Sequence, residues 1–169
     1  MSTESAFKYS ILASGSTGNS FYLETPEKKI LVDAGLSGKK IESLLGEIDR
    51  DIKDVDALLI THEHSDHIKG IGVLARKHGI QLYANELTWQ ELESKNSLGK
   101  IASEQKHIFE MGKTKTFGDI DVESFGVSHD AIAPQFYRFM KDNKSFVLLT
   151  DTGYVSDRMR GTIENADGY

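Results

Sequence analysis

Residues 61–67 form the run Thr61-His62-Glu63-His64-Ser65-Asp66-His67, which directly follows the short apolar stretch 57–60. Such an apolar stretch between polar residues is typical of a buried strand, so the histidines are expected to follow the C-terminal end of that strand. His62, His64 and Asp66 are spaced two residues apart and would point to one side of an extended chain. Three imidazoles and a carboxylate so close together suit a borderline divalent metal such as zinc.

A plainer interpretation gives these residues separate roles, with exposed histidines and Asp66 as the N-cap of a following helix. A pattern this dense arises by chance in few sequences, so a metal site is the favoured interpretation. The run alone cannot supply two metal sites. Three further candidates each end a predicted strand, where α/β proteins gather their ligands: Asp33, His129 and Asp151. Taken singly, each also fits an ordinary turn or loop.

The composition limits the chemistry further. Because the chain has no cysteine, thiolate ligands and disulfides are excluded, and histidine, aspartate and glutamate remain as metal ligands. The net charge of −6 argues against a broadly basic nucleic-acid surface, although bound metal ions can supply positive charge locally. No apolar run approaches the roughly 20 residues of a membrane span, and the N-terminus lacks a secretory pattern. We therefore expect no membrane association and a cytoplasmic location.

Helices interleaved with strand pairs are expected along the chain, which predicts the α/β (α+β) class. No linker or repeat divides the sequence, so residues 1–169 are predicted to form one domain, itself incomplete. In the segment 38–48, the apolar residues Ile41, Leu44, Leu45 and Ile48 have helical spacing. Further helices are predicted at 71–78 and 86–94, and strands at 7–13, 21–24, 29–32, 57–60, 81–84, 113–117, 120–127, 135–141 and 146–150.

With these motifs the sequence resembles the metallo-β-lactamase fold superfamily. The resemblance covers nearly the whole chain and includes Val32-Asp33-Ala34-Gly35, the motif His62-x-His64-x-Asp66-His67, His129 and Thr150-Asp151-Thr152-Gly153. The stretches 13–20, 127–131 and 149–154 are also similar to the YycJ (WalJ)-like nuclease branch of that superfamily. The implied fold is a four-layer αββα sandwich. Members normally continue well past residue 169, so the C-terminal part is expected to be missing here.

The resemblance also implies a role for each candidate residue. The implied metal ligands are His62, His64 and His129 for one ion, Asp66 and His67 for a second ion, and Asp151 as a bridge between both. Asp66 is in addition the candidate catalytic residue, and Asp33 would orient the cluster from behind the ligands. The implied cofactors are two divalent ions, zinc or manganese, per active site of the full-length protein. Family members have a further histidine on the second ion, and no histidine follows His129 in this chain.

Two divalent ions about 3.5–4 Å apart can share a hydroxide and clamp a scissile phosphate. Ions held by two aspartates and a hydroxide keep a net positive charge, which favours an anionic phosphodiester over a neutral ester. By resemblance we expect a metal-dependent hydrolase, specifically a nucleic-acid phosphodiesterase (nuclease) whose partner is its nucleic-acid substrate. Two alternatives stay open: a hydrolase of small thioesters or lactones, and a metal-binding fragment that is itself inactive.

Substrate contacts are less firmly indicated. The glycine-rich loop 14–20 offers backbone amides, with Ser16 and Asn19 as candidate substrate-binding residues, although the same composition fits a plain turn. Three basic pairs would border a phosphate-binding face or simply be solvated charge: Lys39-Lys40, Arg76-Lys77 and Lys113/Lys115.

Overall fold

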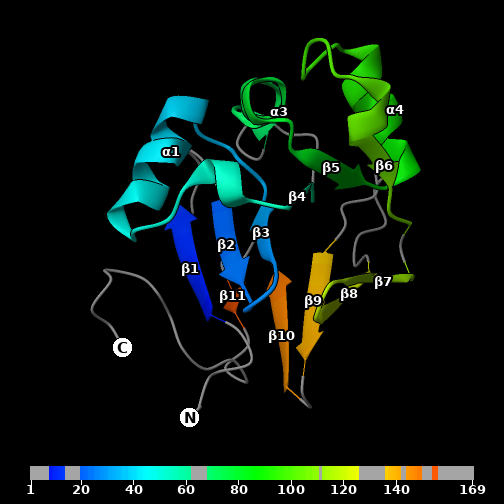
Figure 1. Cartoon of the computed structure of the whole chain (residues 1–169). Coiled ribbons are helices and arrows are strands. Elements are labelled where there is room, and N and C mark those ends of the chain that lie inside the picture. The colour runs from blue at the N-terminus through cyan, green and yellow to red at the C-terminus, as the bar shows by residue number, and fades with distance from the viewer. Residues whose placement is uncertain are drawn as a thin grey trace.

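Two β-sheets packed face to face form the centre of the fold, and helices cover the outer face of one of them (Figure 1). The computed structural model describes residues 8–13, 20–61, 68–110, 112–125, 136–141, 144–149 and 154–155. Within these ranges the helices and the two sheets make three layers, αββ, of the four layers expected from the sequence. None of the helices in the described ranges is long and apolar enough to cross a membrane.

The first sheet, which we name sheet A, has six strands: β1 (Lys8–Ala13), β2 (Ser20–Glu24), β3 (Lys29–Val32), β4 (Ala57–Leu59), β5 (Gln81–Ala84) and β6 (Lys106–Ile108). They lie in sequence order across the sheet. β1, β2 and β3 pair antiparallel, whereas β3 to β6 are parallel. The C-terminal ends of β3 and β4 therefore meet at one edge of the sheet.

The second sheet, sheet B, is antiparallel throughout, in the order β11-β10-β9-β8-β7. Its strands are β7 (Thr114–Phe117), β8 (Ile120–Phe125), β9 (Phe136–Lys141), β10 (Lys144–Leu149) and β11 (Tyr154–Val155). The helices are α1 (Gly38–Glu47), α3 (Ile71–His78) and α4 (Glu86–Ser94), with short 3₁₀ helices η1 (Ile52–Asp54) and η2 (Ser103–Gln105). Helices α3 and α4 have the bounds predicted from the sequence.

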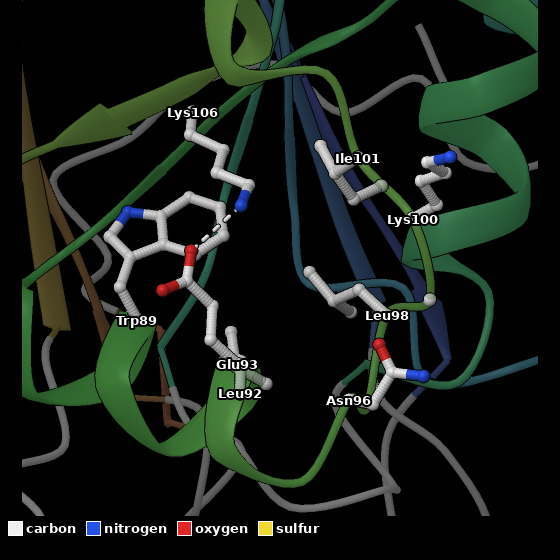
Figure 2. Close-up of a pocket in the computed structure, with 9 residues that line it drawn as sticks. Trp89, Leu92, Glu93, Asn96, Leu98, Lys100, Ile101 and Lys106 are labelled. Atoms are coloured by element: carbon white, nitrogen blue, oxygen red, sulfur yellow. Dashed lines mark hydrogen bonds and ion pairs between the residues drawn. The ribbon is translucent and has the colours of Figure 1, made fainter.

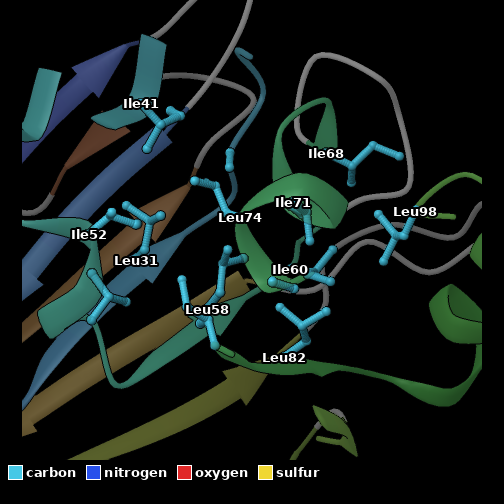
Figure 3. Close-up of a cluster of buried hydrophobic side chains, with 14 of the residues drawn as sticks. Leu31, Ile41, Ile52, Leu58, Ile60, Ile68, Ile71, Leu74, Leu82 and Leu98 are labelled. Carbon is cyan, nitrogen blue, oxygen red and sulfur yellow. The ribbon is translucent and has the colours of Figure 1, made fainter. Parts of the chain in front are cut away.

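The middle strands of sheet A are buried on both faces, because the helices cover one face and sheet B covers the other. Leu31 and Leu58 belong to the core beneath the helices, together with Ile41 of α1 (Figure 3). Their neighbours Val32 and Leu59 belong to the core between the sheets. Since successive side chains of a strand alternate between faces, a strand covered on both sides is apolar throughout. This explains why the stretch before the histidine run contains no polar residue.

Helix α1 confirms the prediction made from apolar spacing. Ile41 and Leu45 are fully buried, while Leu44 lies at the edge of the buried stripe. Ser37 caps the helix, since its hydroxyl oxygen accepts a hydrogen bond from the Lys40 amide. The helix ends at Glu47, one residue before its predicted end.

Two strands, β6 and β11, are not indicated by the sequence pattern. β6 has only three residues without apolar alternation, and it forms because β5 offers an open edge, where Tyr83 pairs with His107. β11 has two residues and pairs with the end of β10. The strand predicted from residue 146 already begins at Lys144, because its hairpin with β9 pairs Lys144 with Lys141. In each case strand pairing, rather than local composition, makes the strand.

Candidate metal centre

The structure describes one of the predicted site residues, Asp33. The other predicted site residues lie outside the described residues: Ser16, Asn19, His62, His64, Asp66, His67, His129 and Asp151. Their roles as ligands or substrate contacts stay predictions. Within the described ranges, no group of three or more His, Asp or Glu side chains is placed to hold a metal ion. The structure does show how the chain is held on both sides of residues 62–67.

Asp33 directly follows β3 and is fully buried. Its φ angle is 62°, a left-handed conformation that aspartate adopts more readily than most residues. Its carboxylate faces Thr61: Oδ1 accepts the Thr61 amide over 2.8 Å, and Oδ2 accepts the Thr61 hydroxyl over 2.6 Å. The Asp33 amide donates to the Leu59 carbonyl, 2.8 Å away, which continues the pairing of β3 with β4. Thr61 is therefore fixed through backbone and side chain one residue before His62.

The loop after β3 also holds the chain on the far side of the run. The carbonyl of Ala34 accepts a hydrogen bond from the Gly70 amide over 2.7 Å. A Cβ atom at Gly70 would lie 2.4 Å from the Leu36 carbonyl oxygen and 2.9 Å from the Gly38 nitrogen, so the close approach requires glycine. The single loop 33–37 thus contacts the chain both just before and just after residues 62–67.

A third contact comes from sheet B. Tyr137 of β9 is fully buried between the sheets, and its Oη donates to the Ile60 carbonyl over 2.8 Å. Ser20, the first residue of β2, donates from Oγ to the Asp33 carbonyl over 2.8 Å. Beyond the last paired residues of β3 and β4, side-chain hydrogen bonds hold the backbone in place of strand pairing. They fix the backbone just before residue 62.

Sequence reasoning identified Asp33 but missed Ser20, Thr61 and Tyr137. For Thr61 there was a clue, because a hydroxyl residue between a buried strand and a polar motif needs a hydrogen-bond partner. Ser20 and Tyr137 offered no clue, since their partners are 13 and 77 residues away in the sequence.

The described residues at this edge fit a nearby divalent ion in their chemistry. A carboxylate buried as fully as that of Asp33 needs several hydrogen bonds to be tolerated, and Thr61 supplies two of them. Hydrogen-bonded carboxylates of this kind commonly support the ligands of a metal ion. The predicted ligand types are imidazole nitrogens and carboxylate oxygens, which suit zinc or manganese.

Two of the basic pairs considered above have members with internal contacts. Arg76 Nη1 donates to the Leu98 carbonyl over 2.6 Å, and Lys77 Nζ lies 3.2 Å from Glu42 Oε2. Lys115 Nζ lies over a buried aromatic ring, 5.7 Å from its centroid. These contacts give the three side chains structural roles.

Lys39 and Lys40 differ, because both are exposed in the first turn of α1. This turn contains no acidic residue, and neither does the first turn of α3. Cations are unfavourable at a helix N-terminus, so the two lysines do not stabilise α1 through its dipole. They add positive charge where the loop from Asp33 enters the helix.

A pocket of about 350 Å³ lies elsewhere, between α4 and the chain that follows it (Figure 2). Trp89, Leu92 and Leu98 provide apolar walls, while Glu93 and Lys106 form an ion pair of 2.7 Å at its side. Since Lys106 begins β6, the pocket lies toward the N-terminal ends of the parallel strands, away from the edge that carries Asp33. Asp33, the predicted site residue that the structure describes, does not line it.

Similar proteins are found over most of the chain. The family described as the β-lactamase superfamily domain matches residues 28–168. The chain is 78% identical over 167 residues to exodeoxyribonuclease WalJ of Streptococcus pneumoniae serotype 2, strain D39, covering 99% of this chain and 62% of that protein. It is 58% identical over 161 residues to exodeoxyribonuclease YycJ of Bacillus anthracis, covering 95% of this chain and 60% of that protein. The chain thus spans less than two thirds of the length of these relatives.

The fold is similar to that of solved metallo-β-lactamases. A metallo-β-lactamase from Cronobacter sakazakii superimposes with a TM-score of 0.67 at 18% sequence identity. The match covers 79% of this chain and 58% of that chain. At this level of identity the likeness shows the fold, which agrees with the αββα architecture expected from the sequence.

Proposed function

This chain belongs to the β-lactamase superfamily, and we propose that it is the metal-binding part of a metal-dependent exodeoxyribonuclease. The observation that carries the proposal is the 78% identity, over 99% of this chain, to a protein named exodeoxyribonuclease WalJ. Because the chain spans 62% of that relative, we propose the activity for the full-length protein.

We assign the divalent ions to the ligands predicted from the sequence: His62, His64, Asp66, His67, His129 and Asp151. Bound divalent ions would neutralise charge on a phosphodiester and lower the pKa of water. The chain's own part is to hold these ligands. Asp33 fixes Thr61, directly before His62, and the Ala34 carbonyl accepts a hydrogen bond from Gly70, three residues after His67. Two ions per site, zinc or manganese, and a catalytic role for Asp66 belong to the same proposal.

An anionic substrate is supported by the charge at this edge of the sheet. The chain as a whole is acidic, yet the first turn of α1 carries Lys39 and Lys40, both exposed and without an acidic neighbour in that turn. We assign them to the phosphate backbone of the DNA strand, which carries the opposite charge. Ser16 and Asn19 are proposed as further substrate contacts.

The proposal is tested with the full-length protein and end-labelled linear DNA, single- or double-stranded, in the presence of manganese or zinc. We expect shortening from the ends, complete loss of cutting after chelation, and no cutting of a covalently closed circle. His64→Ala is expected to fall to background, because no metal-independent route is available to these residues. The rate of cleavage of RNA of the same sequence, measured in parallel, shows whether the protein prefers deoxyribose.

Two results would contradict the proposal. Cleavage of the closed circle at the same rate as linear DNA would show that the protein is an endonuclease and not an exonuclease. Hydrolysis of thioesters or lactones, with every nucleic acid left intact, would favour a hydrolase of small molecules.

A further inference from the structure

Tyr137 carries a hydroxyl group into the apolar layer between the two sheets. The side chain is fully buried in the cluster that includes Val32, Leu59 and Phe109, and its ring centroid lies 5.6 Å from that of Phe109. A phenylalanine would fill this apolar volume equally well, so the hydroxyl must be explained by what it binds. Its partner is the backbone carbonyl of Ile60, 2.8 Å away.

The Ile60 carbonyl lies just beyond the last paired residue of β4. The Leu59 carbonyl is still bound by the amide of Asp33, and the Ile60 amide still donates to the carbonyl of Tyr83. A buried carbonyl at the end of a ladder needs a donor, and here the donor comes from the opposite sheet. This carbonyl lies two residues before His62, the first predicted ligand.

The contact also connects the two sheets whose strands precede the proposed ligands in the sequence. The run 62–67 follows β4 of sheet A, whereas His129 lies between β8 and β9 of sheet B and Asp151 follows β10. Ligands from two sheets reach one metal centre only if the sheets have a fixed offset. At the opposite end of the sandwich, a hydrogen bond from Thr25 to Asp119 links the end of β2 to the turn between β7 and β8. At the end with Asp33, Tyr137 provides a hydrogen bond between the sheets.

We propose that Tyr137 is a positioning residue of the metal centre, which holds the end of β4 in register with sheet B so that ligands from both sheets converge. The inference rests on the proposed ligand set and deepens it. Tyr137 acts through the Ile60 carbonyl, which lies two residues before the first proposed ligand. Removing its hydroxyl leaves a buried carbonyl without this donor and frees the end of β4 to shift, so metal binding weakens while the apolar packing persists.

The test compares Tyr137→Phe with Tyr22→Phe in the full-length protein. Tyr22 is also fully buried, and its Oη donates to Glu24 at the end of sheet A remote from Asp33, so it is a matched loss of one buried phenol hydroxyl. The readout is the zinc dissociation constant, measured by competition with a chromophoric chelator. Urea unfolding of the metal-free proteins gives the stability of each variant. The absorption spectrum of the cobalt-loaded proteins reports the ligand geometry directly.

We expect Tyr137→Phe to weaken zinc binding about three- to tenfold, which is less than the loss usually seen for residues bonded directly to a ligand. Its cobalt spectrum should change, whereas Tyr22→Phe should lower stability and leave both metal readouts unaltered. Unchanged zinc affinity in Tyr137→Phe would overturn the proposal, as would an equal loss in Tyr22→Phe. A Tyr137→Phe protein that fails to fold even with zinc would also overturn it, because the hydroxyl would then serve the fold.

The readout separates this inference from the proposed nuclease function. Wild-type protein that binds zinc but degrades no DNA contradicts the proposed function alone, and the effect of Tyr137→Phe on zinc is still expected. Wild-type protein that binds neither zinc nor manganese overturns both.

Discussion

Thr61 donates two hydrogen bonds to Asp33, one from its amide and one from its hydroxyl, over 2.8 and 2.6 Å. The two residues are 28 positions apart and meet because β3 and β4 are adjacent parallel strands. Asp33 was expected to orient the metal ligands, and the contact shows which residue its carboxylate holds. A buried carboxylate thereby fixes the residue that precedes the predicted metal run.

Thr61→Val should destabilise the protein and weaken metal binding, because it removes one donor to a buried carboxylate. The expected loss of unfolding free energy is about 1.5–3 kcal/mol, the usual range for a hydrogen bond to a charged group. Thr61→Ser keeps the hydroxyl and should restore most of both properties. Urea unfolding and zinc competition measure the two effects. Equal behaviour of the serine and valine variants would show that the hydroxyl is unimportant.

Asp33→Ala should weaken metal affinity by about 10–100-fold, as is usual when a supporting carboxylate is lost.

Asp151→Asn should instead abolish most turnover and leave the fold largely intact, because it removes a proposed bridging charge rather than core packing. Zinc titration and unfolding curves, measured beside the DNA assay, distinguish the two effects. Full turnover in Asp151→Asn would mean that Asp151 is only a turn residue.

Gly70→Ala should destabilise the protein by about 1–3 kcal/mol or more, since the new Cβ would lie 2.4 Å from the Leu36 carbonyl oxygen. Gly46→Ala in α1 is the matched control, because nothing lies within 4 Å of its Cβ position. There the same substitution should stabilise the protein by about 0.5–1 kcal/mol through helix propensity. Thermal unfolding of both variants checks the contrast. A neutral Gly70→Ala would mean that the loop 33–37 can move away from α3.

Stability should fall on acidification because of Glu24. Burial raises the pKa of this carboxyl, but hydrogen bonds from Arg50 and Tyr22 outweigh burial and hold its pKa below the ordinary value. A carboxyl with a lowered pKa in the folded state stabilises the protein above the unfolded-state pKa. That contribution is lost as the pH falls from about 5 through the folded-state pKa.

Urea midpoints measured between pH 7 and pH 3 test this expectation. Glu24→Gln should lower the midpoint at pH 7 and flatten its dependence on pH. Glu93→Gln removes a partner from a more exposed ion pair and should change little. If the urea midpoint of Glu24→Gln depends on pH in the same way as that of the wild type, the Glu24 carboxyl does not cause the loss of stability on acidification.

Replacing Lys39 and Lys40 together by alanine should raise KM for DNA and reduce the dependence of binding on salt, since each phosphate contact contributes about one to the logarithmic salt slope. Stability should not decrease, because cations at a helix N-terminus oppose the helix dipole. Lys53→Ala is the control, with a side chain that is 72% exposed in η1. An unchanged salt slope in the double variant would show that Lys39 and Lys40 do not contact the DNA phosphates.

The local features of this protein could be predicted from its amino-acid sequence. Apolar spacing located α1, and an uninterrupted apolar stretch identified β4 as a buried strand. The histidine run and the aspartate after β3 predicted a family that the comparisons confirm. These features are readable because the burial of one face or of both faces leaves a periodic pattern in the residues themselves.

The contacts between residues that are distant in the sequence could not be predicted in this way. The strand β6 exists because β5 offers an edge, and Tyr137 reaches Ile60 across the sandwich from 77 positions away. Nothing in the local sequence of either residue indicates that contact. Its formation depends on the order of the strands, their register and the offset between the two sheets, and these are fixed only when the whole core packs.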